Sequence, residues 1–343
     1  MSKKAFITGV NGQDGAWLAK LLLDKGYKVY GGVRRGSKRD LTNLKFVGVE
    51  KEVELVEFEL GEYSNIFDVV NKFQFDEFYN LAAQSFVGVS FEQPLYVGEV
   101  NGMAVARLLE AIREVNPEIK FYQASTSEMF GKVMQIPQNE ETPFYPRSPY
   151  GVSKLYAHWL TVNFRESFNM FACSGILFNH ESPLRGPEFV TRKITIQLAK
   201  LSQNQTDKPL ELGNLSSNRD WGFAGDYVEG MWKMLQHEHP DTYVLATNDT
   251  HSIREFVEAA GKIAGFDIVW KGEGLNETGI CRKTGRTLVK VNPKFFRPAE
   301  VDHLIGNPEK AKAILGWNPK INFASLAELM MKADIEKAQK GVL

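Results

Sequence analysis

A tyrosine and a lysine four residues apart, Tyr150 and Lys154, directly follow Ser148 and Pro149. Serine as an N-cap with proline at the first helical position predicts a helix that carries Tyr150 and Lys154 on one face. An ammonium group beside a phenol favours the phenolate, so we expect Lys154 to lower the pKa of Tyr150. Tyr150 is therefore a candidate general base, although the same pair occurs by chance on many helices.

Three hydroxyl groups and a carboxylate, at Ser125 to Glu128, follow an apolar run at 119–124 that predicts a strand. The hydroxyl of Thr126 could share the proton of the phenol. An isolated glutamate after a strand, such as Glu128, is more often a surface residue. Together with Tyr150 and the glycine-rich turn near the N-terminus, the hydroxyl cluster favours a catalytic site.

A glycine-rich turn lies between an apolar run at 5–8 and a stretch of helical periodicity at 16–25. Such a turn aims backbone N–H groups and the positive end of a helix dipole at one point, which suits a pyrophosphate. The spacing G-x-x-G-x-x-G and the position after the first strand favour a dinucleotide site over an ordinary turn. The candidate cofactor residues here are Gly9, Asn11, Gly12, Gln13, Asp14 and Gly15.

The cofactor is predicted to be NADP from the residues after the second expected strand, 27–33. Arg34, Arg35 and Ser37 occur there in place of an acidic residue, and guanidinium groups suit a 2′-phosphate. The alternative is a solvated basic loop. A second cofactor contact is expected after the strand at 77–81, where small residues would admit a ribose, or would only pack a turn. These residues are Leu81, Ala82, Ala83, Gln84 and Ser85.

The elements that position these residues alternate between strands and helices through the first half of the chain. This order predicts an α/β fold with a doubly wound, Rossmann-type parallel sheet, whose strands carry ligands at their carboxyl ends. We expect strands at 5–8, 27–33, 53–58, 77–81, 119–124, 173–177 and 243–246, and helices that include 64–73 and 97–115. Residues 271–291, rich in glycine and basic residues, are expected to form an exposed loop.

Composition narrows the class of protein. The chain has 343 residues and a formal net charge of -1, which gives no reason to expect nucleic acid or a membrane surface as partner. No apolar stretch is long enough to span a membrane. Cys173 and Cys281 are the only cysteines and lie outside any metal-ligand spacing, so we expect reduced thiols in the cytoplasm and no metal site.

Several stretches together resemble the extended short-chain dehydrogenase/reductases and, within them, the GDP-mannose 4,6-dehydratases. The resemblance extends to about Pro319. Its motifs are YQASTSEMFG at 122–131, PFYPRSPY at 143–150, FNHESPLR at 178–185, FVTRK at 189–193, RDWG at 219–222 and FRPAE at 296–300.

The resemblance implies a reaction on a GDP-sugar. Tyr150 would take the proton of the 4-hydroxyl as NADP accepts hydride, and Glu128 would then catalyse loss of water across C5 and C6 before hydride returns to C6. The implied catalytic residues are Thr126, Glu128, Tyr150 and Lys154, with Lys154, His180 and Arg185 also holding the cofactor. The implied substrate residues are Ser85, Ser127, Asn179, Lys193, Arg219 and Arg297.

The resemblance also implies how the chain is organised. Residues 1–180, with returns near 212–250, would form the NADP-binding Rossmann domain, and residues 181–343 mainly a smaller α/β cap that binds substrate. The basic loop after the second strand would reach a neighbouring subunit, which implies a homodimer or homotetramer. A 4-epimerase or simple oxidoreductase of the same fold, or a non-catalytic NADP sensor, remains an alternative, and the GDP-sugar could be a hexose or a heptose.

Overall fold

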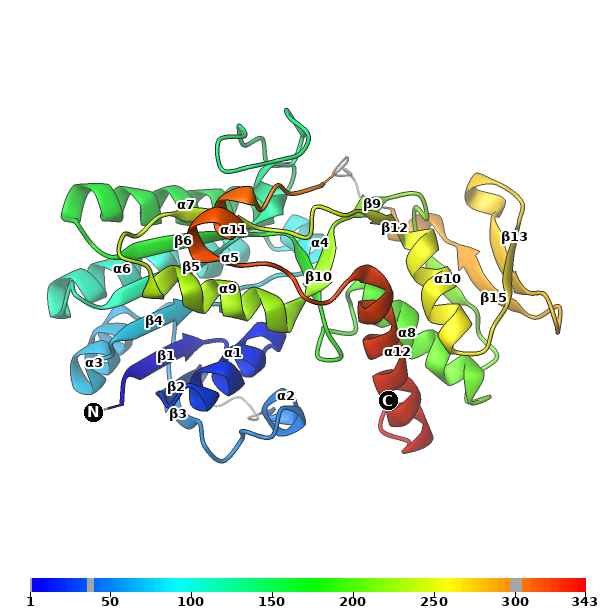
Figure 1. Ribbon diagram of the computed structural model, residues 1–343, viewed down its shortest axis with the longest axis horizontal. Coiled ribbons are helices and arrows are strands. Elements are labelled where there is room, and N and C mark those ends of the chain that lie inside the picture. The colour runs from blue at the N-terminus through cyan, green and yellow to red at the C-terminus, as the bar shows by residue number, and fades with distance from the viewer. Residues whose placement is uncertain (1, 36–39, 297–303) are drawn as a thin grey trace.

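The computed structural model describes residues 2–35, 40–296 and 304–343, and a parallel sheet of seven strands organises it (Figure 1). The strand order is β11-β6-β5-β4-β1-β2-β3, with every neighbouring pair parallel. The doubly wound α/β fold expected from the sequence is therefore confirmed. The strands are β1 Lys4–Thr8, β2 Lys28–Val33, β3 Glu54–Glu57, β4 Glu77–Asn80, β5 Lys120–Thr126, β6 Ala172–Leu177 and β11 Thr242–Leu245.

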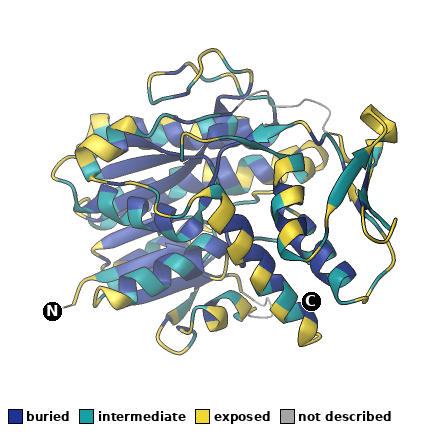
Figure 2. Ribbon diagram, turned by 45° about the vertical axis from the view of Figure 1, so that its right-hand side comes forward, coloured by how far each residue is buried: buried dark blue, intermediate teal, exposed yellow. Residues whose placement is uncertain are grey.

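Helices cover both faces of this sheet, because the side chains of its strands are apolar in both directions. In β1, Ala5 and Ile7 belong to one apolar cluster and Phe6 to the other. The first cluster includes residues of α1 Gln13–Asp24, α9 Ala224–Gln236 and α11 Glu309–Leu315. The second includes residues of α3 Tyr63–Phe73, α6 Ala104–Val115 and α7 Pro149–Phe168. Figure 2 shows the strands buried between these two layers.

The strand order reverses direction at β1. From β1 the chain adds β2 and β3 on one side, then crosses to β4 on the other. In doubly wound sheets a ligand binds outside the carboxyl ends of the strands at this reversal. The turn after β1, which contains the three spaced glycines, therefore occupies the position where the fold places a ligand.

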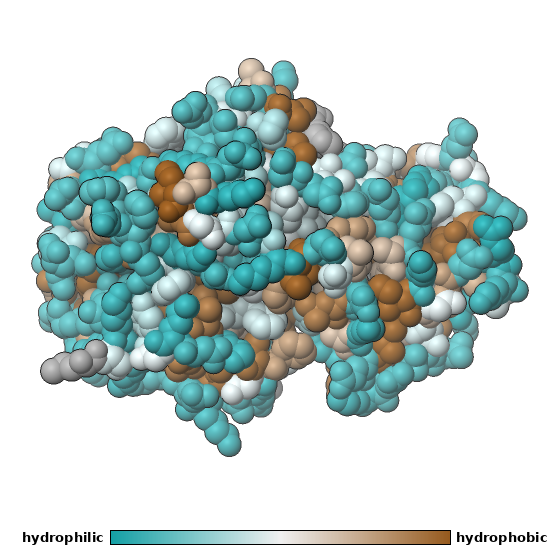
Figure 3. Space-filling view, viewed as in Figure 1, coloured by the Kyte–Doolittle hydropathy of each residue, from teal (hydrophilic) through white to brown (hydrophobic). Residues whose placement is uncertain are grey.

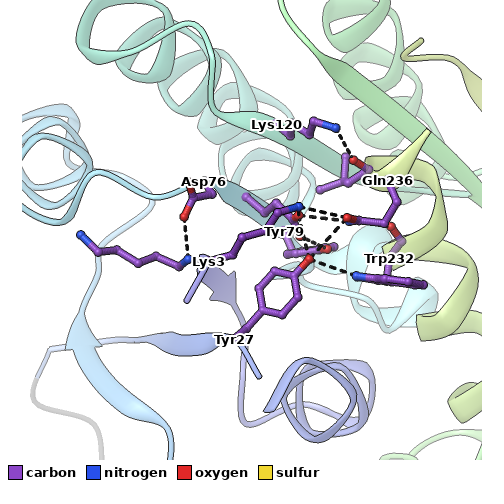
Figure 4. A network of polar contacts seen from close by, with 10 residues as sticks. Lys3, Tyr27, Asp76, Tyr79, Lys120, Trp232 and Gln236 are labelled. Carbon is purple, nitrogen blue, oxygen red and sulfur yellow. Dashed lines mark hydrogen bonds and ion pairs between the residues drawn. The ribbon is translucent and has the colours of Figure 1, made fainter. Parts of the chain in front are cut away.

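A cluster of polar side chains lies at the other end of the sheet, where the strands begin (Figure 4). The carboxylate of Glu77, at the start of β4, is fully buried. Its Oε1 accepts hydrogen bonds from Lys3 at 3.1 Å, Tyr27 at 2.9 Å and Gln236 at 3.1 Å, and its Oε2 accepts one from Tyr79 at 2.7 Å. The cluster connects the residues just before β1 and β2 with β4 and α9, away from the carboxyl ends of the strands, so we assign it to stability.

Removal of the hydroxyl in Tyr79→Phe is expected to lower the free energy of unfolding by about 1–3 kcal/mol, because a buried carboxylate oxygen loses its donor. Urea unfolding measures this change. Tyr63→Phe is the matched control, since the Tyr63 hydroxyl donates to Glu114 at the surface, and it should cost less than about 0.5 kcal/mol. Equal losses in the two variants would contradict the assignment of Glu77.

A second, smaller sheet lies apart from the first. Its order is β13-β14-β15-β8, with α8, α10 and α12 packed into the same apolar cluster. A capping box formed by Ser252 and Glu255 begins α10. Figure 3 shows apolar residues gathered between this part and the larger sheet. The bounds are β8 Leu210–Leu212, β13 Ile268–Lys271, β14 Thr278–Cys281, β15 Thr287–Val291, α8 Val190–Ser202, α10 Ile253–Ile263 and α12 Phe323–Gln339.

The expectation of an exposed loop at 271–291 is wrong, because β14 and β15 lie within it. The glycines that suggested a loop form turns around short antiparallel strands: Gly272, Gly274 and Gly285 all have positive φ. Leu288 and Val289 are fully buried against the smaller core. Strands this short, with few apolar residues, resemble loop sequence until a partner strand is placed beside them.

Short elements join the two parts of the structure. Two pairs of short strands connect segments distant in sequence, and a single π-helical segment interrupts the helix expected at 97–115. Among the described residues, no helix is long and apolar enough to cross a membrane. The bounds are β7 Asn179–Glu181 with β10 Trp221–Phe223, β9 Asn218–Arg219 with β12 His251–Ser252, α2 Thr42–Phe46, α4 Val87–Glu92, α5 Pro94–Gly98 and the π-helix Glu99–Met103.

Candidate active site

The glycine turn has a geometry that only glycine can adopt. Gly9 has a φ of 68°, and a Cβ there would lie 3.0 Å from the Ala82 Cα. A Cβ on Gly15 would lie 2.3 Å from the Gly9 carbonyl oxygen. Gly12 is the N-cap of α1, which begins at Gln13, three residues earlier than expected. The first-turn N–H groups of α1 therefore point to the carboxyl edge of β1, as a phosphate cradle requires.

Side chains from β7 and the segment after it hold this turn from outside. The carboxylate of Asp14 pairs with His180 Nε2 at 2.8 Å, while His180 Nδ1 contacts the Phe178 carbonyl at 2.7 Å. Ser182 Oγ donates to Gln13 Oε1 at 2.9 Å. The imidazole lowers the pKa of Asp14 against the effect of its burial. Gln13, Asp14 and His180 thus lie at or beside the turn, with their side chains engaged in protein contacts, and their role in binding a cofactor stays a prediction.

The segment after β4 closes the turn from the other side. Leu81 N and Ala82 N both donate to Thr8 Oγ1 at 3.0 Å, which brings this backbone beside β1. Gln84 exchanges two hydrogen bonds with the Asn101 side chain, its N donating at 2.8 Å and its carbonyl accepting at 3.0 Å. Sequence reasoning missed Asn101. Its π-helical setting, which is common at functional sites, was not visible from periodicity.

The helix α7 begins as predicted, with Ser148 Oγ accepting a hydrogen bond from Gly151 N at 3.0 Å and Pro149 in first position. Tyr150 and Lys154 both face inward and are buried. Lys154 Nζ donates to the Ala124 carbonyl at 2.9 Å, and burial lowers the pKa of the lysine to about 8. The helix and the end of β5 therefore meet through these side chains.

The expected pKa of Tyr150 is corrected by the structure. Burial raises the pKa of this phenol to about 12, the Glu128 carboxylate adds to the rise, and a hydrogen bond with Thr126 opposes it. Lys154 does not lower the pKa as the sequence suggested, because its ammonium group is directed to the Ala124 carbonyl. The neutral phenol is therefore favoured, and Thr126 is the side chain that assists its ionisation.

Thr126 connects the two acid–base residues. Its hydroxyl caps the short 3₁₀-helix Ser127–Met129 by accepting a hydrogen bond from Glu128 N at 3.2 Å, and it also bonds Tyr150. Ser127 is buried and Glu128 half-buried. The end of β5 thus brings the carboxylate and the phenol to one place, although they are 22 residues apart in the chain.

His158 is a buried residue of α7 that lies beside these side chains. It lies one turn beyond Lys154 on α7, is buried, and its Nδ1 lies 3.1 Å from Ser125 Oγ. Burial lowers the pKa of His158 to about 4, so the imidazole is neutral near neutral pH. Three side chains at four-residue spacing, Tyr150, Lys154 and His158, therefore align α7 along the end of β5.

The basic residues expected at the 2′-phosphate follow β2. Arg34 and Arg35 are exposed there, and Ser37 lies outside the described residues. Arg35 pairs with the carboxylates of Glu62 at 3.4 Å and Glu57 at 3.9 Å. Exposed pairs of this kind are weak, and a phosphate can exchange with them. Arg34 and Arg35 thus follow the second strand, where the sequence analysis expected the 2′-phosphate. The observed contacts of Arg35 are to carboxylates of the protein.

The predicted substrate residues belong to separate elements. Asn179 lies on β7, Arg219 on β9, where it is buried, and Lys193 on α8. Lys193 Nζ lies 3.3 Å from the centroid of the Phe295 ring, and burial lowers its pKa. Ser85 is exposed beyond β4. Arg297 lies outside the described residues.

Arg185 was predicted to hold the cofactor and lies in a cation–π contact. Its guanidinium carbon is 3.7 Å from the centroid of the Phe189 ring, and its Nε is 3.2 Å from Glu181 Oε2. Burial raises the pKa of Glu181, while Arg185 and a hydrogen bond from Thr191 oppose the rise. Arg185 is therefore fixed beside the segment that contacts the glycine turn.

Asp220, next to Arg219, holds three segments together. Its carboxylate accepts hydrogen bonds from Thr247 N at 2.8 Å, Thr247 Oγ1 at 2.6 Å, Asn248 N at 3.0 Å and Gly306 N at 3.3 Å. Burial raises the pKa of Asp220 to about 6, although these hydrogen bonds lower it. Asp220 thus connects the segment that contains Arg219, a predicted substrate residue, with residues 247–248 and with Gly306.

The raised pKa of Asp220 predicts a pH-dependent stability. Between pH 3.8 and about 6 the folded protein holds a proton on Asp220 that the unfolded chain has lost, so its contribution falls by about 1.4 kcal/mol per pH unit. This contribution is fully present below pH 3.8 and lost above about 6. Asp220→Asn should lack this slope when urea unfolding is followed across that range. Parallel curves for the two proteins would contradict the assignment.

The fold and the tyrosine–lysine helix define a protein of the extended short-chain dehydrogenase/reductase class. A solved structure with the same fold is the dTDP-glucose 4,6-dehydratase of Bacillus anthracis in complex with NAD. It is 20% identical, has a TM-score of 0.81, and the alignment covers 100% of each chain. At 20% sequence identity, the likeness between the two structures establishes the fold alone.

The family model for GDP-mannose 4,6 dehydratase matches residues 6–330, and the chain belongs to this family. Among its relatives is the GDP-mannose 4,6 dehydratase of Drosophila melanogaster, 50% identical over 99% of this chain and 88% of the relative. The GDP-mannose 4,6 dehydratase of Homo sapiens is 48% identical over 97% of this chain and 91% of the relative. The resemblance seen in the sequence motifs is therefore confirmed.

Proposed function

We propose that this protein is an NADP-dependent hydro-lyase that converts GDP-mannose, or a closely related GDP-manno-sugar such as a heptose, to the 4-keto-6-deoxy sugar. Membership of the family supports the reaction. The observation that carries the proposal is at the end of β5, where Thr126 bonds Tyr150 and the Glu128 carboxylate lies near enough to raise the pKa of that phenol, so that two acid–base groups could act on one sugar. An epimerase or a simple oxidoreductase needs only the tyrosine, Tyr150, as its acid–base group.

The glycine turn and the basic residues after β2 have the shape and charge that NADP requires. The glycine turn leaves no space for a Cβ at Gly9 or Gly15, which is the expected shape of a backbone cradle for a pyrophosphate. Arg34 and Arg35 supply cationic charge for a 2′-phosphate, and we assign Lys154 and Arg185 to further contacts with the cofactor. NADP, when bound, accepts hydride from the sugar and later donates it back.

The first proton transfer is assigned to Tyr150. Its phenolate oxygen takes the proton of the 4-hydroxyl while the C4 hydrogen leaves as hydride, so that a ketone forms at C4. Burial raises the pKa of this phenol, and formation of the phenolate therefore depends on the hydrogen bond from Thr126. We assign Thr126 to stabilising the base, and Lys154, which donates to the Ala124 carbonyl, to holding α7 and the cofactor in position.

The second proton transfer is assigned to Glu128. The 4-ketone acidifies the C5 hydrogen, and the carboxylate removes it. The same carboxyl group then protonates the C6 oxygen, which leaves as water and creates a double bond between C5 and C6. With the cofactor bound, hydride would return to C6 and a proton to C5, which would give the 4-keto-6-deoxy sugar without net change of the cofactor. Half-burial of Glu128 limits exchange of this proton with solvent.

The GDP-sugar is assigned to the residues between the two sheets. Lys193 and Arg219 supply positive charge for the diphosphate, and the sequence adds Arg297. Asn179, Ser85 and Ser127 supply hydrogen-bonding groups for the sugar. We propose residues 1–180, with returns near 212–250, as the NADP-binding domain and 181–343 as mainly the substrate domain; α11, which packs in the apolar cluster of the large sheet, would be a further return.

The reaction is tested by incubating the purified protein with GDP-mannose and following the mass of the sugar nucleotide. We expect loss of one water and no net reduction of NADP. Stoichiometric NADPH, or a product of unchanged mass, would contradict the proposal and favour an oxidoreductase or an epimerase. A matched incubation with a GDP-linked heptose distinguishes the two substrates.

We also propose that the chain forms at least a homodimer through α5 and α7. Val152, Tyr156 and Trp159 on α7 are about half exposed, and Leu95 on the adjoining α5 is 88% exposed. A groove of about 450 Å³ lies along α7, lined by Val152, Tyr156, Trp159 and neighbours such as Leu155. A two-fold axis across α7 would place Trp159 of each copy on the groove of the other.

Light scattering should give at least twice the mass of the chain, and Trp159→Lys should weaken dimerisation by about 100-fold or more. Leu275→Lys, an equally exposed apolar position in the smaller sheet region, is the control and should leave the mass unchanged. A wild-type monomer at micromolar concentration would contradict the proposal.

The buried free thiols of Cys173 and Cys281 support a further proposal of a cytoplasmic location.

A further inference from the structure

Lys337, near the end of α12, contacts two segments that both touch the glycine turn. Its Nζ donates to the Pro183 carbonyl at 3.1 Å and lies 5.2 Å from the centroid of the Phe46 ring. Pro183 belongs to the segment after β7, and Phe46 ends α2. The C-terminal helix thus reaches both walls of the turn through one side chain.

The Pro183 contact leads directly to the turn. Pro183 follows Ser182, whose hydroxyl donates to Gln13 at 2.9 Å and accepts from Leu184 N at 3.1 Å. The Pro183 carbonyl also accepts from Arg192 Nε at 3.2 Å. Two cationic side chains therefore converge on one backbone oxygen, adjacent to the residue that holds the first position of α1.

The Phe46 contact leads to the turn from the other wall. In α2, Asn43 Nδ2 donates to the Asn11 carbonyl at 3.0 Å. Asn11 lies inside the glycine turn, between Gly9 and Gly12. The Lys337 ammonium over the Phe46 ring therefore connects α12 with the helix that orients the turn's own backbone.

The part of α12 from which Lys337 projects is held in place by buried contacts. One turn earlier on α12, Asp334 is fully buried, pairs with Arg192 at 2.9 Å and accepts from Thr195 Oγ1 at 2.6 Å. These contacts fix α12 against α8. A lysine that projects from a fixed helix can transmit that position to the segments it touches, whereas a lysine on a loose helix could not.

We propose that Lys337 is a positioning residue for the cofactor, which holds the Ser182–Pro183 segment and α2 around the glycine turn and so slows the release of NADP. This inference rests on the proposed NADP-dependent function. The role differs from that of the residues at the turn, because Lys337 acts through Pro183 and Phe46. It makes retention of the cofactor depend on the C-terminal helix.

The test compares Lys337→Met with the wild type by NADPH fluorescence, both as a titration and as a dissociation rate. Methionine keeps most of the length of the unbranched side chain and removes the charge and the donors. We expect the dissociation constant and the dissociation rate to rise about three- to tenfold, since Arg192 still holds the Pro183 carbonyl. Lys337→Arg, which can donate to the same oxygen and stack on Phe46, should stay within about twofold of wild type.

Lys332→Met is the matched control, because Lys332 lies on the same helix and pairs with Glu328 at the surface. It should leave NADPH release unchanged. Thermal unfolding without nucleotide measures any general loss of stability. An unaltered dissociation rate in Lys337→Met, or an equal change in Lys332→Met, would overturn the proposal.

Amide hydrogen exchange separates this inference from the proposed function. In Lys337→Met the amides at 182–185 should exchange faster than in wild type, whether or not nucleotide is added. Faster exchange with unchanged NADPH release would show that the contact is only structural and would overturn the inference. Failure of the wild type to bind NADPH, with faster exchange in the variant, would instead contradict the proposed cofactor.

Discussion

Glu128→Gln is expected to abolish loss of water from GDP-mannose, with a fall in turnover of about 10³-fold. Glutamine keeps the size of the side chain but cannot accept the C5 proton or protonate the C6 oxygen. Oxidation at C4 should survive, because Tyr150 and Lys154 keep their contacts at the end of β5. Mass spectrometry of the sugar nucleotide measures the lost elimination, and the near-ultraviolet absorbance of reduced nicotinamide measures the oxidation that remains.

Deuterium exchange sharpens this result. In D₂O the wild type should introduce deuterium at C5, and Glu128→Gln should not, since no base removes that hydrogen. Glu141→Gln removes an exposed carboxylate from the segment before α7 and should behave as wild type. If Glu128→Gln still formed the 4-keto-6-deoxy product at the wild-type rate, another residue would have to act as the C5 base.

Tyr150→Phe is expected to stop both steps, with turnover again reduced by about 10³-fold. Without the phenol no base accepts the 4-hydroxyl proton, so the ketone that acidifies C5 is never formed. Neither reduced nicotinamide nor deuterium at C5 should appear. Stopped-flow absorbance and mass spectrometry, applied as for Glu128→Gln, therefore distinguish the two variants by which step is lost.

Tyr156→Phe is the control, because Tyr156 lies on the same helix, half exposed and away from β5. It should retain wild-type turnover. Binding of GDP should be unchanged in Tyr150→Phe, since the predicted diphosphate residues lie on β9 and α8. Deuterium incorporation at C5 in Tyr150→Phe would contradict the order of the two steps.

Local sequence was enough to predict the elements that carry the site. The glycine turn after a strand and the helix begun by Ser148 and Pro149 depend on residues adjacent in the chain, and both have the predicted form. The alternation of strands and helices likewise predicted the doubly wound sheet. The conformational preferences of neighbouring residues and the period of the apolar residues decide such local elements. The sequence by itself therefore determined these features.

Only the tertiary structure decided which distant groups meet. Asp14 and His180 are 166 positions apart, and Gln13 and Ser182 are 169 apart, so no local pattern joins them. The same holds for the strands within 271–291, whose apolar residues became recognisable only with a second sheet beside them. Burial of Tyr150 raised the pKa that its spacing from Lys154 had suggested would fall. Desolvation and hydrogen-bond partners depend on what surrounds a group in space, and the chain order of its neighbours does not contain that information.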